Sequence, residues 1–177
     1  ITSVTFSNGV TDIGDGAFYG CSKLTSIEIP SNIISIGKEA FYNCTLLDKL
    51  KVLGNNIAVG ASAFARCAIT NATVPSDFIT YLPKDKLTTV VVSSGSSIPY
   101  AAFSGCTTLT SVTLPSTILT IGASAFNGCS GLKSISIPNK VTSIGERAFA
   151  KSGLTSITIY ASVTSFGGGV FWDCKSL

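Results

Sequence analysis

The sequence predicts an α/β solenoid in which short parallel strands stack turn upon turn and short helical or extended segments connect them. Periodicity is the first observation, because the phenylalanines of recurring Ala-Phe pairs stand 23 residues apart, except for one gap of 39. Composition is the second: the chain is 45% hydrophobic and only 12% charged, which is enough for a continuous core. A fixed period of this length is the signature of a repeat architecture. Those phenylalanines are Phe18, Phe41, Phe64, Phe103, Phe126 and Phe149.

Each turn opens with a short strand. In the turn that begins at Leu109, apolar and polar residues alternate over 111–114 and several are β-branched, which is typical of a half-buried strand. Pro115 closes this strand, and Gly122 suits the turn that follows. The small residues of 123–127 are expected to form one or two helical turns on the opposite side.

One turn cannot bury its own apolar residues, so the turns must stack on one another. Candidate strands begin with an apolar residue at steps of 18 to 23 residues, which divides residues 1–177 into eight turns of a single domain. The pattern is already running at Ile1 and still running at Leu177, so the domain is expected to be truncated at both ends. The positions that open these strands are Ile1, Leu24, Leu47, Ile69, Leu87, Leu109, Leu132, Leu154 and Leu177.

The full repeat, L-x-x-[IV]-x-[IL]-P-x-x-[IV]-x-x-I-G-x-x-A-F-x-x-C, resembles the BspA-like class of leucine-rich repeats over nearly the whole chain. The resemblance implies a right-handed leucine-rich-repeat solenoid with a parallel sheet on the concave face and short helical or extended segments on the convex face. It also implies an extracellular or cell-surface location, since such proteins are typically surface or secreted proteins of bacteria and parasitic protists. Adhesion to host proteins or to other microbes is the role that the resemblance implies.

The pattern breaks in the turns that cover 69–108. The turn at 69–86 lacks the Ile-Gly, Ala-Phe and Cys positions, and the following turn has a serine-rich middle. The favoured interpretation is a tolerated deletion whose gap is filled by aromatic residues. The alternative is a ligand-shaped notch marked by Phe78, Tyr81 and Tyr100.

The six cysteines occupy a single position of the repeat, where the seventh turn has Ser152 instead. Parallel side chains of one column point the same way, which makes the dihedral angle of a disulfide hard to reach. We therefore expect free, buried thiols. No C-x-x-C pair and no histidine are present, so no metal site is expected. The cysteines are Cys21, Cys44, Cys67, Cys106, Cys129 and Cys174.

Catalysis and several other functions find little support in the residues. The chain has no histidine, which is the commonest general base, and no recurring pair of carboxylates. The glycine clusters at 14–16 and 167–169 fall at ordinary turn positions of the repeat. We therefore expect no enzyme and no cofactor. The small net charge of +3, with scattered Lys and Arg, disfavours nucleic-acid binding, and no apolar run is long enough to insert into a membrane.

The outward strand positions form the candidate protein-binding site on the concave face. Most carry hydroxyl groups, and Glu28 beside Lys49 and Lys51 is the one charged cluster among them. A docking face and a merely solvated strand surface explain the hydroxyl residues equally well. A solvated cross-strand pair is favoured for the charges. The candidate residues are Ser26, Glu28, Lys49, Lys51, Asn71, Thr73, Thr89, Ser111, Thr113, Ser134 and Ser136.

The sequence thus predicts a non-enzymatic binding module for a protein partner, such as a host or microbial surface or matrix protein. The alternative is a structural stalk or spacer within a larger surface protein. Because neither end carries a recognisable cap, self-association through the open ends is also expected.

Overall fold

The computed structural model describes residues 1–177 and divides them into two compact units, Ile1–Pro83 and Lys84–Leu177. We call them the N-terminal and C-terminal units and describe each by itself. Both are parallel β-solenoids built from strands of two to four residues. That the two units form one continuous domain stays a prediction.

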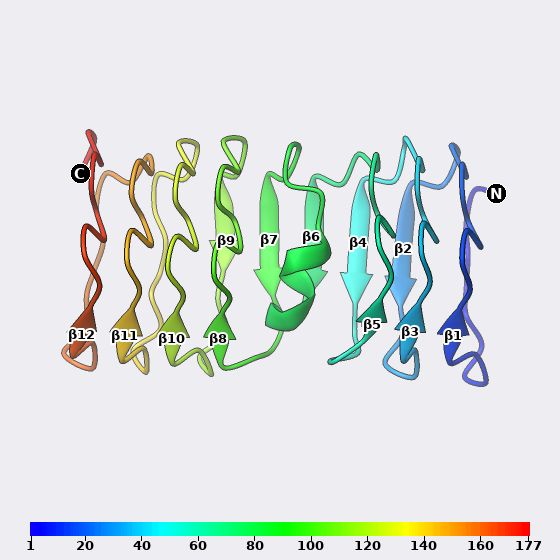
Figure 1. Cartoon of the computed structure of the whole chain (residues 1–177), viewed down its shortest axis with the longest axis horizontal. Coiled ribbons are helices and arrows are strands. Elements are labelled where there is room, and N and C mark those ends of the chain that lie inside the picture. The colour runs from blue at the N-terminus through cyan, green and yellow to red at the C-terminus, as the bar shows by residue number, and fades with distance from the viewer. The chain divides into compact units, whose positions relative to one another are not determined.

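The principal sheet of the N-terminal unit contains β2 (Ser26–Ile29), β4 (Lys49–Val52) and β6 (Asn71–Val74), which pair in parallel in that order (Figure 1). Side chains of β2 and β4 alternate between exposed and buried, as the period of a strand requires. Ile29 and Val52 are fully buried and pair with each other across the ladder. The predicted strands of these turns are therefore confirmed.

Each unit also has a second and narrower ladder, which is built from strands of two residues. In the N-terminal unit, β1 (Asp12–Ile13), β3 (Ser35–Ile36) and β5 (Ala58–Val59) pair in parallel. The C-terminal unit has the same two ladders. There β7 (Thr89–Val92) pairs with β9 (Ser111–Thr113), and a second ladder joins β8 (Ser97–Ile98), β10 (Thr120–Ile121), β11 (Ser143–Ile144) and β12 (Ser165–Phe166).

Some expected strands are not formed. Residues 132–138 and 156–160 belong to no strand, although the repeat predicts strands there. Burial still alternates, since Ile135 and Ile137 are only 8% and 2% exposed while Ser134 and Ser136 are exposed. The apolar pattern therefore determines which side chains face the core. It does not require the ladder hydrogen bonds between neighbouring backbones.

The expected helical turns are also absent, because the only helix is a 3₁₀ helix, η1 (Ser76–Tyr81). In place of helices, backbone amides of most turns donate to the next turn: those of Ser124 and Phe126, for example, donate to the carbonyls of Glu146 and Ala148, at 2.8 and 2.7 Å. Those amides are therefore not available for helical bonds. The structure forms about seven such turns instead of eight, because η1 replaces the second ladder in the turn at 69–86. Right-handedness stays a prediction.

A column of phenylalanine rings runs through the core of each unit, as predicted. In the N-terminal unit Phe18, Phe41 and Phe64 stack with centroids 5.0 and 5.1 Å apart. In the C-terminal unit the corresponding separations, from Phe103 to Phe171, lie between 5.1 and 5.7 Å. The planes of stacked neighbours differ by at most 19°. Rings held this way align successive turns and give the stack one register.

The cysteines form a second column in each unit, and all six are free, as predicted, but Cys21 and Cys174 are only partly buried because each lies in a turn at the end of its unit. The thiols of Cys67 and Cys129 donate to the carbonyl oxygens of Phe41 and Phe103, both at 3.1 Å. Burial raises the pKa of each of these two thiols to about 12. A neutral thiol at this position is therefore a packing group with one weak hydrogen bond.

Candidate functional site

The outward side chains of β2, β4 and β6 form a polar surface, which we call the strand face. It consists of two rows that cross the sheet, because the strands pair in register. One row is Ser26, Lys49 and Asn71, and the other is Glu28, Lys51 and Thr73. The structure thus brings together six of the predicted site residues on a single side of one sheet.

The charged side chains of the strand face lie on β2 and β4. Lys51 donates to Glu28 across the ladder with an Nζ–Oε2 distance of 2.9 Å, and both side chains are about half exposed (50% and 53%). Lys49 is exposed and makes no ion pair. Because one lysine is paired and the other is free, the face presents a net positive charge beside hydroxyl and amide groups.

The C-terminal unit carries the remaining predicted residues. Thr89 on β7 pairs with Ser111 on β9, and Thr113 follows two residues further along β9. Ser134 and Ser136 are exposed but lie outside any strand. The C-terminal unit therefore offers a smaller, uncharged patch of hydroxyl groups.

The three aromatic residues of the predicted notch differ in their surroundings. Phe78 is buried, with 2% of its surface exposed, and its ring lies edge-on to Tyr81 at a centroid distance of 5.5 Å. Tyr81 and Tyr100 are 41% and 75% exposed. Tyr100 belongs to the C-terminal unit, whereas the other two belong to the N-terminal unit. Of the three candidate notch residues, Phe78 therefore lies in the core, and only the two tyrosines reach the surface.

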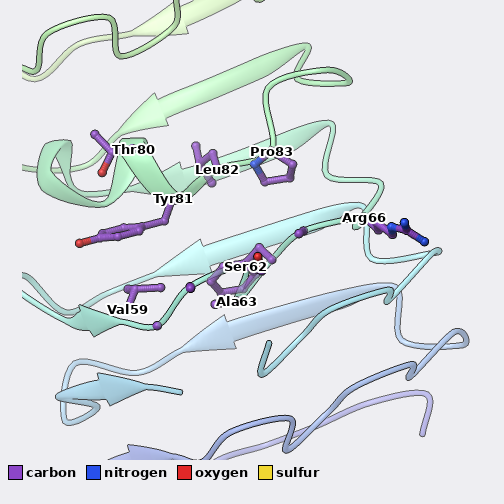
Figure 2. Close-up of a pocket in the computed structure, with 12 residues that line it drawn as sticks. Val59, Ser62, Ala63, Arg66, Thr80, Tyr81, Leu82 and Pro83 are labelled. Carbon is purple, nitrogen blue, oxygen red and sulfur yellow. The ribbon is translucent and has the colours of Figure 1, made fainter. Parts of the chain in front are cut away.

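A hollow of about 430 Å³ opens beside η1 in the N-terminal unit. Figure 2 shows Thr80, Tyr81, Leu82 and Pro83 along one side, and Val59, Ser62 and Ala63 along the other. Its lining is the segment 59–66 together with 80–83. Sequence reasoning identified Tyr81 but missed the opposite wall, because the segment 59–66 follows the ordinary repeat and carries no unusual residue.

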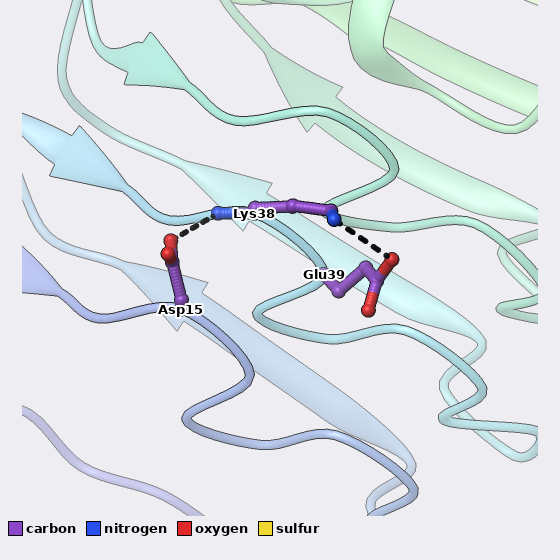
Figure 3. Close-up of polar contacts among 3 residues, drawn as sticks. All are labelled: Asp15, Lys38 and Glu39. Carbon is purple, nitrogen blue, oxygen red and sulfur yellow. Dashed lines mark hydrogen bonds and ion pairs between the residues drawn. The ribbon is translucent and has the colours of Figure 1, made fainter.

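A second polar cluster lies at the narrow ladder of the N-terminal unit. The backbone amide of Lys38 donates to Asp15 Oδ1 at 2.7 Å, while its Nζ lies 3.8 Å from Glu39 Oε1 (Figure 3). Nearby, hydrogen bonds from the hydroxyls of Ser35 and Thr11 lower the pKa of Asp12. These groups are solvated and join adjacent turns. They do not converge on a shared point, as the groups of a catalytic site would.

Two classes of site have no counterpart in the structure. No group of three or more His, Cys, Asp or Glu side chains lies close enough to hold a metal ion. No helix has the length and apolar character needed to cross a membrane.

The parallel ladders and the stacked columns of side chains define the class of the protein as a repeat solenoid. Within that class, the chain belongs to the family described as BspA type leucine rich repeat region, which matches six copies over residues 1–86 and 84–177. A search of curated proteins finds no match.

Solved structures of leucine-rich repeat proteins are similar to the chain. A protein from Bacteroides ovatus is 30% identical with a TM-score of 0.62, and the match covers 98% of this chain and 40% of that one. A leucine-rich repeat protein from T. pallidum is 28% identical with a TM-score of 0.57, covering 95% and 72%. A leucine-rich cell surface protein from Faecalibacterium prausnitzii is 26% identical with a TM-score of 0.52, covering 100% and 66%. The chain thus spans less than half of the Bacteroides ovatus protein.

Proposed function

We propose that the chain is a non-enzymatic binding segment of a cell-surface or secreted protein, and that it recognises a protein partner through the strand face. The observation that carries the proposal is the pair of aligned rows on β2, β4 and β6, which hold Lys49 and Lys51 at their centre and Glu28 beside Lys51. Family membership and the similarity to a protein described as a leucine-rich cell surface protein support the location.

The composition of the strand face suits docking to a protein. Short Ser, Thr and Asn side chains lose little rotamer entropy on binding, so their hydrogen bonds contribute with a small entropic cost. Lys49 adds a free positive charge, and Lys51 can exchange Glu28 for a carboxylate of a partner. A partner with an acidic patch is therefore the expected ligand.

The test is a binding screen of the chain against extracellular-matrix and cell-surface proteins, such as those of a host or of other microbes. A variant with Lys49→Ser and Lys51→Ser removes the positive charge of the strand face. The matched control, Lys140→Ser with Lys175→Ser, removes the same charge at exposed positions of the C-terminal unit. We expect saturable, salt-sensitive binding that the first variant loses and the control retains.

Equal loss of binding in both variants would show that binding depends on the overall charge of the chain and not on the strand face. Binding to no protein in the screen would favour the alternative, a structural stalk or spacer within a larger surface protein. Self-association of the chain would be detected in the same samples as a mass that rises with concentration in sedimentation.

A further inference from the structure

A repeated set of three backbone hydrogen bonds joins adjacent turns on the side that carries the phenylalanine column. In each set, amides at alternate positions of one turn donate to carbonyls at alternate positions of the next. Glu39, Phe41 and Asn43, for example, donate to Ala61, Ala63 and Ala65, at 2.8 to 3.0 Å. The sets that begin at Gly16, Ala101, Ser124 and Arg147 have the same arrangement. This regularity makes a missing set easy to recognise.

One set of donors inside the N-terminal unit has no acceptors. By the repeat, the amides of Ser62, Phe64 and Arg66 should donate to the next turn, but none of them donates to any carbonyl. The following turn contains η1 in place of the segment that would supply the carbonyls. All three residues line the hollow beside η1. The hollow is therefore lined by an incomplete set of inter-turn backbone hydrogen bonds in addition to apolar side chains.

The outer two donors have the same backbone conformation as the corresponding residues of turns in which the three hydrogen bonds are formed. Ser62 and Arg66 both have φ at 60°, close to the 55° and 59° of Glu39 and Asn43, which do have acceptors. A left-handed conformation is costly for residues other than glycine, so a free loop would tend to relax out of it. The three amides therefore remain positioned to donate to carbonyls at alternate residues of a neighbouring segment, as the amides of complete turns do.

The lining of the hollow suits the backbone of a peptide better than it suits a charged ligand. The Arg66 guanidinium lies 5.4 Å from the centre of the Tyr42 ring, and Figure 2 shows its side chain directed away from the other labelled residues. No other charged residue lines the hollow. A phosphate or another free anion would leave the evenly spaced amides poorly matched, whereas an extended peptide offers carbonyls at alternate residues.

We propose that the hollow beside η1 binds an extended, uncharged peptide segment of a protein partner, which runs parallel to 61–67 and completes the interrupted ladder. Three of its carbonyls, at alternate residues, accept from Ser62, Phe64 and Arg66. This is recognition by strand addition, at a site separate from the strand face.

The complete turns also indicate which side chains the peptide should carry. The residue that supplies the middle carbonyl is small and buried in every set, as Ala40, Ala63, Ala125, Ala148 or Val170. The residue after it is a phenylalanine of the column. Here Phe78 already packs against Phe64, at 5.8 Å, and occupies that space. The peptide should therefore have a small residue at both positions.

The probe is a synthetic peptide with the sequence of residues 120–128 in which Phe126 is replaced by Ser. Its carbonyls at Ala123, Ala125 and Asn127 are those that accept from the preceding turn in the C-terminal unit. Binding is followed residue by residue through amide chemical shifts and hydrogen exchange of the whole chain. We expect saturable shifts and at least about tenfold slower exchange at Ser62, Phe64 and Arg66. The amides of Glu39, Phe41 and Asn43 should not change.

Binding of the probe at the hollow should depend on side-chain size and not on charge. The same peptide with Ala125→Trp should bind at least about tenfold more weakly, because the position beside Ala63 admits only a small side chain. The Lys49→Ser, Lys51→Ser variant of the protein should bind the probe normally, and added salt should have little effect. The amides of Gly169, Phe171 and Asp173 in the last turn also donate to no carbonyl, so the probe could bind there as well. A measurement at individual residues is therefore needed to tell which of the two places the probe occupies.

Three results would overturn the proposal. One is free exchange at Ser62, Phe64 and Arg66 at saturating peptide. Another is protection confined to the last turn, and the third is equal affinity for the Ala125→Trp peptide. Loss of binding in the lysine variant would instead transfer the interaction to the strand face.

Discussion

The ring of Phe78 packs edge-on against the ring of Phe64, with centroids 5.8 Å apart and planes at 68°. Phe64 ends the run of parallel rings in the N-terminal unit, and Phe78 covers it from η1 in a different orientation. A residue from an irregular segment thus performs the packing role that the Ala-Phe pair performs elsewhere. The core remains closed although the turn is shortened.

Replacing Phe78 with Ala should lower the free energy of unfolding by about 3 to 5 kcal/mol, because a fully buried aromatic ring is lost and a cavity remains. Urea denaturation followed by circular dichroism measures the change. Tyr81→Ala is the control, since Tyr81 is 41% exposed, and should cost about 1 kcal/mol. Equal costs for the two substitutions would contradict a core role for Phe78.

Gly37→Ala should destabilise the N-terminal unit by about 1 to 3 kcal/mol, because the added Cβ would meet the preceding turn. It would lie 2.4 Å from the backbone nitrogen of Asp15 and 2.6 Å from the carbonyl carbon of Gly14. Gly14→Ala occupies the same repeat position with nothing within 4 Å, and should change stability by less than about 0.5 kcal/mol. Thermal and urea unfolding of both variants would test the difference; similar stabilities would show that the turns can separate to accept a methyl group.

Alkaline pH should weaken the fold through the buried cysteines. The unfolded thiol has a pKa of 9.0, while burial raises the pKa of Cys67 to about 12. Because the folded pKa is the higher one, the unfolded chain loses its proton first. The contribution of the protonated Cys67 thiol to the free energy of unfolding is therefore fully present below about pH 9 and is lost as the pH rises toward about 12.

The measurement is urea unfolding of the wild type and of Cys67→Ala at about pH 8 and about pH 10. The loss of stability between the two values should be smaller in the variant, although the variant itself is less stable. Identical pH dependence in the two proteins would mean that the thiol ionises without unfolding.

The ion pair between Glu28 and Lys51 should contribute little to stability. Both side chains are about half exposed at a distance of 2.9 Å, so solvent screens their attraction. A double-mutant cycle with Glu28→Gln and Lys51→Gln should give a coupling energy of about 0.2 to 1 kcal/mol that falls with added salt. A larger, salt-independent value would indicate a structural pair that is unavailable to a partner.

Much of the fold could be predicted from the sequence because the repeat is long and regular. The spacing of Phe41 and Phe64 predicted the column of rings, and the shared position of the cysteines predicted free thiols. The strand face was also within reach, because side chains alternate strictly along a strand, which placed Glu28, Lys49 and Lys51 together.

Other features depended on partners that the sequence pattern does not specify. The segment 123–127 was expected to be helical, but its amides bond to the next turn. Ser134 and Ser136 keep the burial pattern of a strand without its pairing. The hollow arises because the segment after Phe64 follows the repeat while the next turn does not, and no single residue marks that mismatch.

By itself the sequence determined the period, the buried columns and the surface that faces outward, since each follows from the residue's place within one turn. Only the tertiary structure decided which backbone hydrogen bonds and core contacts form between neighbouring turns. It closed the core with Phe78 and left Ser62, Phe64 and Arg66 without acceptors. The physical reason is that side-chain burial is encoded locally, whereas a backbone hydrogen bond between turns needs a matching carbonyl from another part of the chain.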